Sequence, residues 1–204
     1  MIFPISKAKY AIIKNIYECK SISISELISK SRASRKKGYE YIGELLDAEI
    51  AEEKLEGKKP VLRFLKPKFS ENGKNIFALI ENDKAYSFFN KHQELKGAFF
   101  YFKNDIIKLN AVAIIFGSFA RNAEDKESDI DILIIGKKKD KKAIEKIAGK
   151  CFITLKRRVS LRFTERAEFI KAIKNKDAFA LQILKEHIVV ANAREWVDML
   201  ENYN

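Results

Sequence analysis

The chain has 204 residues, 47% of them hydrophobic and 33% charged, with a formal net charge of +12. This apolar content supports a packed core and excludes a wholly disordered chain. The longest apolar runs have the length of strands, far below the roughly 20 residues that a membrane helix needs, and the N-terminus lacks the pattern of an export signal. We therefore expect a cytoplasmic protein without a membrane span.

The positive charge and the cysteines bear on possible ligands. Residues 1–70 hold 15 Lys and Arg against 9 Asp and Glu, and residues 111–204 hold 19 against 14, so both ends could meet a polyanion. A solvated, lysine-rich surface of the kind found in heat-adapted proteins explains these counts equally well. Cys19 and Cys151 form no Cys-x-x-Cys pair, and there are only two histidines, so the sequence predicts no zinc site and two buried thiols.

Three helices followed by a hairpin are predicted over the first 68 residues. Apolar spacing predicts helices over residues 7–20 and 34–48, and between them the capping box Ser23-x-x-Glu26 starts a short helix. Tyr39 is expected on the apolar face of the third helix. Two extended runs around a glycine-containing turn predict the hairpin, and they cover residues 51–55 and 61–65.

This order of elements resembles the winged helix-turn-helix family over residues 5–68. In such folds the third helix enters the major groove, and the hairpin, or wing, contacts the DNA backbone or the minor groove. The resemblance implies that phosphates are contacted by the basic residues at the start of the third helix and at the tip of the wing, namely Arg32, Arg35, Lys36, Lys37, Lys58 and Lys59. The alternative is a dimerisation or docking module with a solvated basic face.

Residues 71–108 are predicted to form a mainly helical connector. Its aromatic and aliphatic residues recur at helical spacing, and we expect them to be core residues, among them Phe77, Phe88, Phe99, Phe100 and Phe102. The domain boundaries that follow are a first domain over residues 1–70, the connector over 71–108 and a second domain over 109–204.

The second domain begins with a pattern that carries chemistry. An apolar strand over residues 111–116 ends at Gly117-Ser118, where a tight turn leads into a short helix whose amides could hold an anion. The next predicted strand, residues 129–135, starts with Asp129 and Asp131. Strand geometry puts both carboxylates on one face, and such hard oxygen ligands suit Mg²⁺. The alternative is a pair of exposed acids, or partners for the many lysines.

The segment 115–132 resembles the core motif of the DNA polymerase beta-type nucleotidyltransferase superfamily, and most of all its small prokaryotic "minimal" group. Gly117-Ser118 and Asp129-x-Asp131 are separated by ten residues, which is the spacing of that group. The resemblance implies an α/β fold with a mixed sheet flanked by helices over about residues 105–200. It also implies that Gly117 and Ser118 bind the triphosphate of ATP or another NTP, that Arg121 assists them, and that Asp129 and Asp131 hold two Mg²⁺ ions for attack by an acceptor hydroxyl.

One departure from the family pattern concerns the third carboxylate, which the family carries on a later, adjacent strand. The candidate strand here, residues 158–163, places Ser160 at that position and Arg162 on the same face. Transferase chemistry is therefore expected to be weakened or lost, even where the fold is kept.

The remaining pattern predicts helices over residues 166–174, 177–185 and 194–200, with Trp196 as a core anchor.

Three functions remain open. The first is transfer of an NMP group from an NTP to a hydroxyl of a protein or nucleic acid, and in the minimal group an antitoxin can so modify a HEPN-type toxin, which here would be a separate protein. The second is a catalytically weak or inactive, nucleotide-sensing, DNA-binding regulator or antitoxin. The third, weaker one is modification of RNA ends. A homodimer is expected if the chain binds DNA, because two half-sites multiply affinity.

Overall fold

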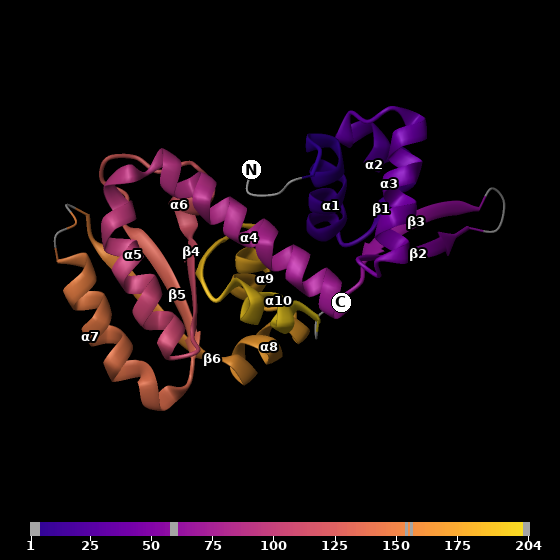
Figure 1. Cartoon of the computed structure of the whole chain (residues 1–204). Coiled ribbons are helices and arrows are strands. Elements are labelled where there is room, and N and C mark those ends of the chain that lie inside the picture. Colours follow the sequence, from indigo (N-terminus) through magenta and orange to yellow (C-terminus); the bar gives the residue numbers. More distant parts are fainter. Residues whose placement is uncertain (1–4, 58–60, 154, 156, 202–204) are drawn as a thin grey trace. The chain divides into compact units, whose positions relative to one another are not determined.

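The computed structural model describes residues 5–57, 61–153, 155 and 157–201, and it divides into two compact units (Figure 1). The first unit is Met1–Ile80 and the second is Glu81–Tyr203. Helix α4 (Glu71–Lys91) contains the boundary, so the predicted connector is divided between the two units. Within the described residues, no helix combines the length and apolar character that a membrane span needs.

Three helices and a small sheet make up most of the first unit. Each helix begins after a serine, Ser6, Ser23 or Ser34, whose hydroxyl accepts a backbone N–H of the first turn, as a good N-cap does. The bounds agree closely with the prediction: α1 (Lys7–Cys19), α2 (Ile24–Ser31) and α3 (Arg35–Asp47). Their apolar stripes meet in a core that contains Ile12, Ile16, Leu27, Ile42, Leu45 and Leu65.

The sheet of the first unit is antiparallel and has the order β1-β3-β2. The predicted hairpin is present as β2 (Ala51–Glu56) and β3 (Leu62–Pro67), and the short strand β1 (Ile22–Ser23), which was not predicted, pairs with β3. Two expectations are wrong here. Tyr39 is 42% exposed on α3 rather than in the core, and the thiol of Cys19, the last residue of α1, is exposed rather than buried.

A four-stranded mixed sheet forms the centre of the second unit, as predicted. Its order is β6-β5-β4-β7, in which β5 and β6 are parallel and the other neighbours are antiparallel. The strands are β4 (Val112–Phe116), β5 (Ile130–Gly136), β6 (Val159–Glu165) and β7 (Ile188–Ala191). Strand β4 is buried along its whole length because it lies inside the sheet and is covered on both faces.

Helices flank both faces of this sheet (Figure 1). On one face, α5 (Gln93–Lys108) and α7 (Lys141–Phe152) bury an aromatic and aliphatic core that includes Phe99, Phe102, Ile115, Ile130, Ile132 and Phe152. On the other side lie α8 (Arg166–Lys174), α9 (Ala178–Lys185) and α10 (Ala193–Glu201). Helix α7, together with the 3-10 turn Lys138–Asp140 before it, was not predicted.

The aromatic residues of the second unit follow the prediction only in part. Trp196, the single tryptophan of the sequence, is 0% exposed, which confirms its predicted place in the core. Phe88, Phe99 and Phe102 are buried as expected. Phe100 and Tyr101, however, are 62% and 67% exposed, because they lie on the side of α5 that faces away from the sheet.

Candidate functional site

The Gly117-Ser118 motif lies where β4 ends and the one-turn helix α6 (Gly117–Ala120) begins. Gly117 has a φ of +73°, a conformation that L-residues with a side chain rarely adopt. A Cβ atom at this position would lie 2.5 Å from Oδ2 of Asp131. The glycine is therefore required twice, once by its backbone conformation and once by the close approach of the carboxylate.

Asp131 lies in β5 and is flanked on both sides within the sheet. In the register of the strands its neighbours are Phe116 on β4 and Ser160 on β6. Asp129 was predicted to lie in the strand, but β5 begins only at Ile130, so this carboxylate belongs to the residue just before the strand. Ile130 and Ile132 are both 0% exposed and belong to the core on the α5–α7 face, as predicted, so the side chain of Asp131 lies on the opposite face.

Neither Asp129 nor Asp131 forms a hydrogen bond or an ion pair within the described part of the chain, and both are half-buried. These carboxylates are therefore available to a ligand. The alternative of lysine partners receives no support from the described residues.

The loop between the two halves of the motif is held by a residue that the sequence analysis did not single out. The Nη1 atom of Arg157 donates to the backbone carbonyls of Asp125, Lys126 and Ser128, at 2.7, 3.2 and 3.2 Å. Its guanidinium also lies over the ring of Phe119, 5.3 Å from the centroid. Arg157, two residues before β6, thus contacts residues next to both motif halves, because Phe119 follows Ser118 and Ser128 precedes Asp129.

The same loop contains a compact turn around Asp125. Its carboxylate accepts the hydroxyl of Ser128 at 2.8 Å and the backbone N–H of Glu127 at 2.9 Å. The hydrogen bond from Ser128 is the main reason that the pKa of Asp125 lies below its ordinary value, and the nearby charge of Arg157 contributes less. This turn fixes the chain immediately before Asp129.

Arg121, the predicted helper in phosphate binding, ends helix α6 and is exposed. Its guanidinium forms an ion pair with Glu186 at 3.6 Å, and the neighbouring Asn122 accepts a hydrogen bond from Lys91 at 3.0 Å. The cation thus already has a carboxylate partner. Its role toward a nucleotide stays a prediction.

The position of the expected third carboxylate is occupied by a serine. The parallel register pairs Asp131 with Ser160 and Leu133 with Arg162. The Arg162 guanidinium lies over the rings of Phe116 and Phe179, 5.7 and 5.0 Å from their centroids. This part of the sheet therefore presents two carboxylates, a hydroxyl and a guanidinium.

This donor set decides how many metal ions the site can hold. Among the described residues, no three His, Cys, Asp or Glu side chains gather in a metal-binding group. Two carboxylates suit one Mg²⁺, which usually keeps water and takes phosphate oxygens as its other ligands. The residues present therefore fit one ion and do not fit the two-ion site that the family resemblance implies.

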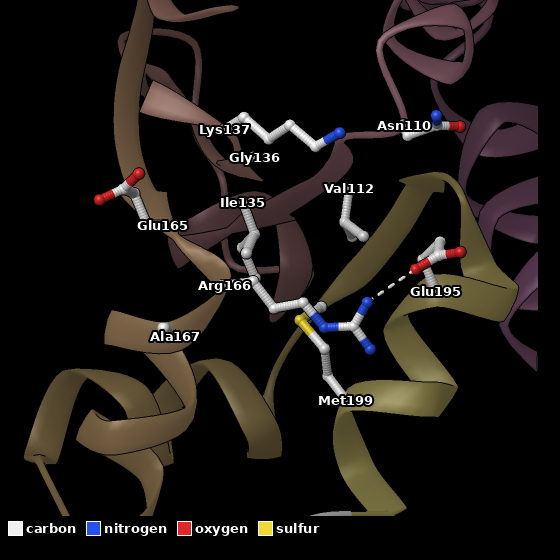
Figure 2. A pocket seen from close by; sticks show the side chains of 10 residues that line it. All are labelled: Asn110, Val112, Ile135, Gly136, Lys137, Glu165, Arg166, Ala167, Glu195 and Met199. Carbon is white, nitrogen blue, oxygen red and sulfur yellow. Dashed lines mark hydrogen bonds and ion pairs between the residues drawn. The ribbon is translucent and has the colours of Figure 1, made fainter. Parts of the chain in front are cut away.

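A cavity of about 400 Å³ lies at the other end of the same sheet (Figure 2). It is lined by Val112 at the start of β4 and Gly136 at the end of β5, whereas Gly117 and Asp131 lie at the opposite ends of these strands. Arg166 reaches from α8 to Glu195 on α10, where the two form an ion pair at 2.9 Å (Figure 2). None of the predicted site residues lines this cavity.

The predicted DNA-contacting residues of the first unit lie around the start of α3. Arg32, which ends α2 with a left-handed φ of 56°, is exposed, and so are Arg35 and Lys36. Lys37 instead forms an ion pair with Glu40 at 2.6 Å, and its hydrogen bond to Glu40 raises the pKa of the lysine. Lys58 and Lys59, predicted at the wing tip, lie outside the described residues.

Tyr39 is a candidate contact residue that the sequence analysis assigned to the core. It lies one helical turn after Arg35, and its exposed ring adds an aromatic surface to the basic start of α3. Ile42 and Leu45 are buried and already form the apolar face with which α3 packs in the core, so the helix does not need Tyr39 for its packing.

Comparison with known proteins bears on the second unit. Residues 99–195 match the family model described as Polymerase beta, Nucleotidyltransferase. No curated protein and no solved structure matches the chain. The matched region contains all four strands of the mixed sheet and both halves of the motif. Over residues 99–195 the C-terminal part of this chain is therefore similar to nucleotidyltransferases of the polymerase beta family.

Proposed function

We propose that the second unit binds an NTP such as ATP together with Mg²⁺ at Gly117, Ser118, Asp129 and Asp131. The observation that supports this proposal is the approach of the Gly117 backbone to the Asp131 carboxylate, because a phosphate held at the turn would lie close to a metal ion held by the carboxylate. The two carboxylates, which have no partner within the described residues, support the same assignment.

Each residue of this site has a separate role in the proposal. Asp129 and Asp131 would hold one Mg²⁺, which when bound supplies Lewis acidity and neutralises phosphate charge. Gly117 leaves space for the backbone to approach a phosphate, and Ser118 offers its amide and hydroxyl. Arg157 keeps Asp129 in place through the loop carbonyls that it binds.

We propose that transfer of the NMP group to an acceptor is slow. A serine at position 160 does not accept the proton of an acceptor hydroxyl as a carboxylate does. A nucleotide-responsive regulator or antitoxin is therefore favoured over a fast transferase. If transfer does occur, its acceptor would be a hydroxyl of a nucleic acid or of a separate protein, such as a HEPN-type toxin.

We further propose that the first unit is a winged helix that binds DNA through Arg32, Arg35 and Lys36. The order of three helices and a hairpin supports this proposal, as do these three exposed cations, which have no ion-pair partner within the described residues. Lys37 contributes less in this proposal, because Glu40 already neutralises it. A homodimer on two half-sites is the corresponding form on DNA.

Nucleotide binding is tested by the melting temperature of the second unit, which is monitored by the fluorescence of the buried Trp196. ATP with Mg²⁺ should raise this melting temperature, since a ligand at 100 times its Kd stabilises the folded state by about 2.7 kcal/mol. Asp129→Ala should remove the Mg²⁺-dependent part. Asp105→Ala, a matched change of a half-buried carboxylate on α5, should keep it. An equal shift in wild type and Asp129→Ala would refute the site.

A second experiment separates binding from transfer. The protein is incubated with α-labelled ATP and Mg²⁺, alone and with the protein encoded next to it, beside Asp129→Ala and Ser160→Asp. We expect little label on wild type or acceptor and more with Ser160→Asp, because this change restores a carboxylate opposite Asp131. Fast labelling by the wild type that Asp129→Ala abolishes would instead establish an active transferase.

A further inference from the structure

The charge on the motif side of the sheet differs from that of a site with three carboxylates. Asp129 and Asp131 contribute two negative charges, while the later strand contributes the neutral Ser160 and the positive Arg162. Relative to three carboxylates, the exchange of one acid for a hydroxyl and the added guanidinium make the site more positive by two charges. This difference equals the charge of one divalent ion.

The position of Arg162 makes its cation part of this site. Strand alternation puts Arg162 on the same face as Ser160, and Ser160 is the neighbour of Asp131 in the register. The guanidinium lies over the ring of Phe116, which is the neighbour of Asp131 on the other strand. The side chain of Arg162 thus extends along this face of the sheet toward Phe116, Asp131 and Ser160, which are neighbours across three strands.

The two aromatic rings hold the guanidinium without consuming its hydrogen-bond donors. Phe116 and Phe179 meet edge to face with their centroids 5.4 Å apart, and Arg162 lies over both. A guanidinium above aromatic faces keeps its N–H groups for acceptors such as phosphate oxygens. Arg162 forms no ion pair with a carboxylate in the described part of the chain, so its charge is not already neutralised by a protein group.

We propose that Arg162 takes the place of the second metal ion. In this proposal, which rests on the proposed nucleotide binding, the site holds one divalent ion on Asp129 and Asp131, and the Arg162 guanidinium donates to an oxygen of the triphosphate. The ligand class is a nucleoside triphosphate carrying a single divalent ion. The arginine acts here as a fixed binding group that needs no ion from solution.

The first test counts the ions and needs no variant. The protein is dialysed to equilibrium against Mn²⁺ and a saturating ATP analogue whose α,β-bridge is a methylene group, and the excess of Mn²⁺ over the protein-free side, where the analogue binds Mn²⁺ equally, is measured. One Mn²⁺ per chain is expected. Two would overturn the proposal while leaving nucleotide binding intact. Absence of both Mn²⁺ and analogue binding would instead refute the proposed function itself.

The second test addresses the guanidinium. Arg162→Gln should raise the Kd of the analogue about tenfold or more, as expected for the loss of a hydrogen bond to a charged group. Arg162→Lys should recover only part of the loss, because an ammonium lacks the planar fork. The matched control is Arg166→Gln, whose guanidinium pairs with Glu195 at the other end of the sheet and whose change should leave the Kd alone.

The third test restores the third carboxylate and removes the guanidinium. In the double variant Ser160→Asp/Arg162→Gln, three carboxylates are present and a second Mn²⁺ should bind per chain. The melting temperature read from Trp196 shows whether each variant is folded. An unchanged Kd in folded Arg162→Gln, or one Mn²⁺ in the folded double variant, would overturn the assignment.

Discussion

A Cβ atom on Gly117 would lie 2.5 Å from Oδ2 of Asp131, which is closer than two non-bonded atoms of these kinds can approach. This close approach brings together the Gly117-Ser118 turn at the end of β4 and the Asp129-x-Asp131 segment at the start of β5. Because Asp131 lies near the start of β5 and is paired with a neighbouring strand on each side, an added methyl group at Gly117 must displace either the turn or the carboxylate.

Gly117→Ala should therefore destabilise the second unit and impair its nucleotide site. A non-glycine residue in a sparsely populated φ region costs on the order of 1–3 kcal/mol, and the clash with Asp131 adds to this. Urea unfolding followed by Trp196 fluorescence measures the loss. ATP and Mg²⁺ should no longer stabilise the variant.

The matched control is Gly149→Ala on helix α7 of the same unit. A Cβ atom there would meet nothing within 4 Å, and alanine favours a helix over glycine by about 1 kcal/mol. This variant should be as stable as wild type or more so. A Gly117→Ala protein that unfolds like Gly149→Ala and still binds nucleotide would contradict the role given to Gly117.

DNA binding by the first unit should depend on salt through Arg35 and Lys36. The double variant Arg35→Ala/Lys36→Ala should flatten the slope of log K against log salt concentration by roughly two units, since each phosphate contact contributes about 0.9. Fluorescence anisotropy with a labelled duplex at several salt concentrations gives the slope.

A charge-matched control distinguishes contact from net charge. Lys14→Ala/Lys30→Ala removes two cations that already pair with Glu18 and Glu26 within their helices, so the slope should stay close to that of wild type. Equal slopes in all three proteins would favour a docking role for this unit. Tyr39→Ala, examined beside them, should weaken binding without changing the slope, because it removes an exposed ring and no charge.

Arg157 should control the order of the loop before Asp129. In Arg157→Ala, three backbone carbonyls lose their donor, and amides of residues 123–128 should exchange hydrogen faster by mass spectrometry. The stabilisation by ATP and Mg²⁺ should fall as well, because Asp129 directly follows this loop. Arg158→Ala is the neighbouring control, since Arg158 accepts the N–H of Ile130 with its backbone carbonyl, which the substitution keeps. Similar exchange in both variants would remove the assignment.

Much of the fold could be predicted because its elements have strong local signals. Serine caps start the helices of the first unit, and the apolar run 112–116 is long enough for one buried strand. Helix α7 was missed although Ile144, Ala148 and Phe152 recur at helical spacing and are buried. This spacing is the local signal that predicts the helix.

The parts that could not be predicted depend on contacts between distant segments. Tyr39 follows the helical period of its neighbours, and only the packing of the unit shows that its ring is exposed. The role of Arg157 depends on carbonyls about 30 residues away, which no local pattern encodes. The sequence pattern predicted Ser160 at the place of the third carboxylate on an adjacent strand, and the structure adds that Ser160 pairs with Asp131. How Arg162 packs on Phe179 was not predicted, since it requires the position of α9.

The titration midpoint of Asp125 should rise by different amounts in variants that remove the contacts of its turn. Its pKa is lowered in the folded chain, so the stabilisation that it gives is complete above the ordinary value of about 3.9 and is lost as pH falls through the lower, folded value. Carboxyl NMR gives the titration midpoint. Ser128→Ala should raise this midpoint most, since the Ser128 hydroxyl is the main cause, and Arg157→Ala should raise it less. Asp105→Asn, on α5, should leave it unchanged. A midpoint of Asp125 that Ser128→Ala does not move would show that the turn is not held by this hydrogen bond, and the ordering of Asp129 by the turn would have to be abandoned with it.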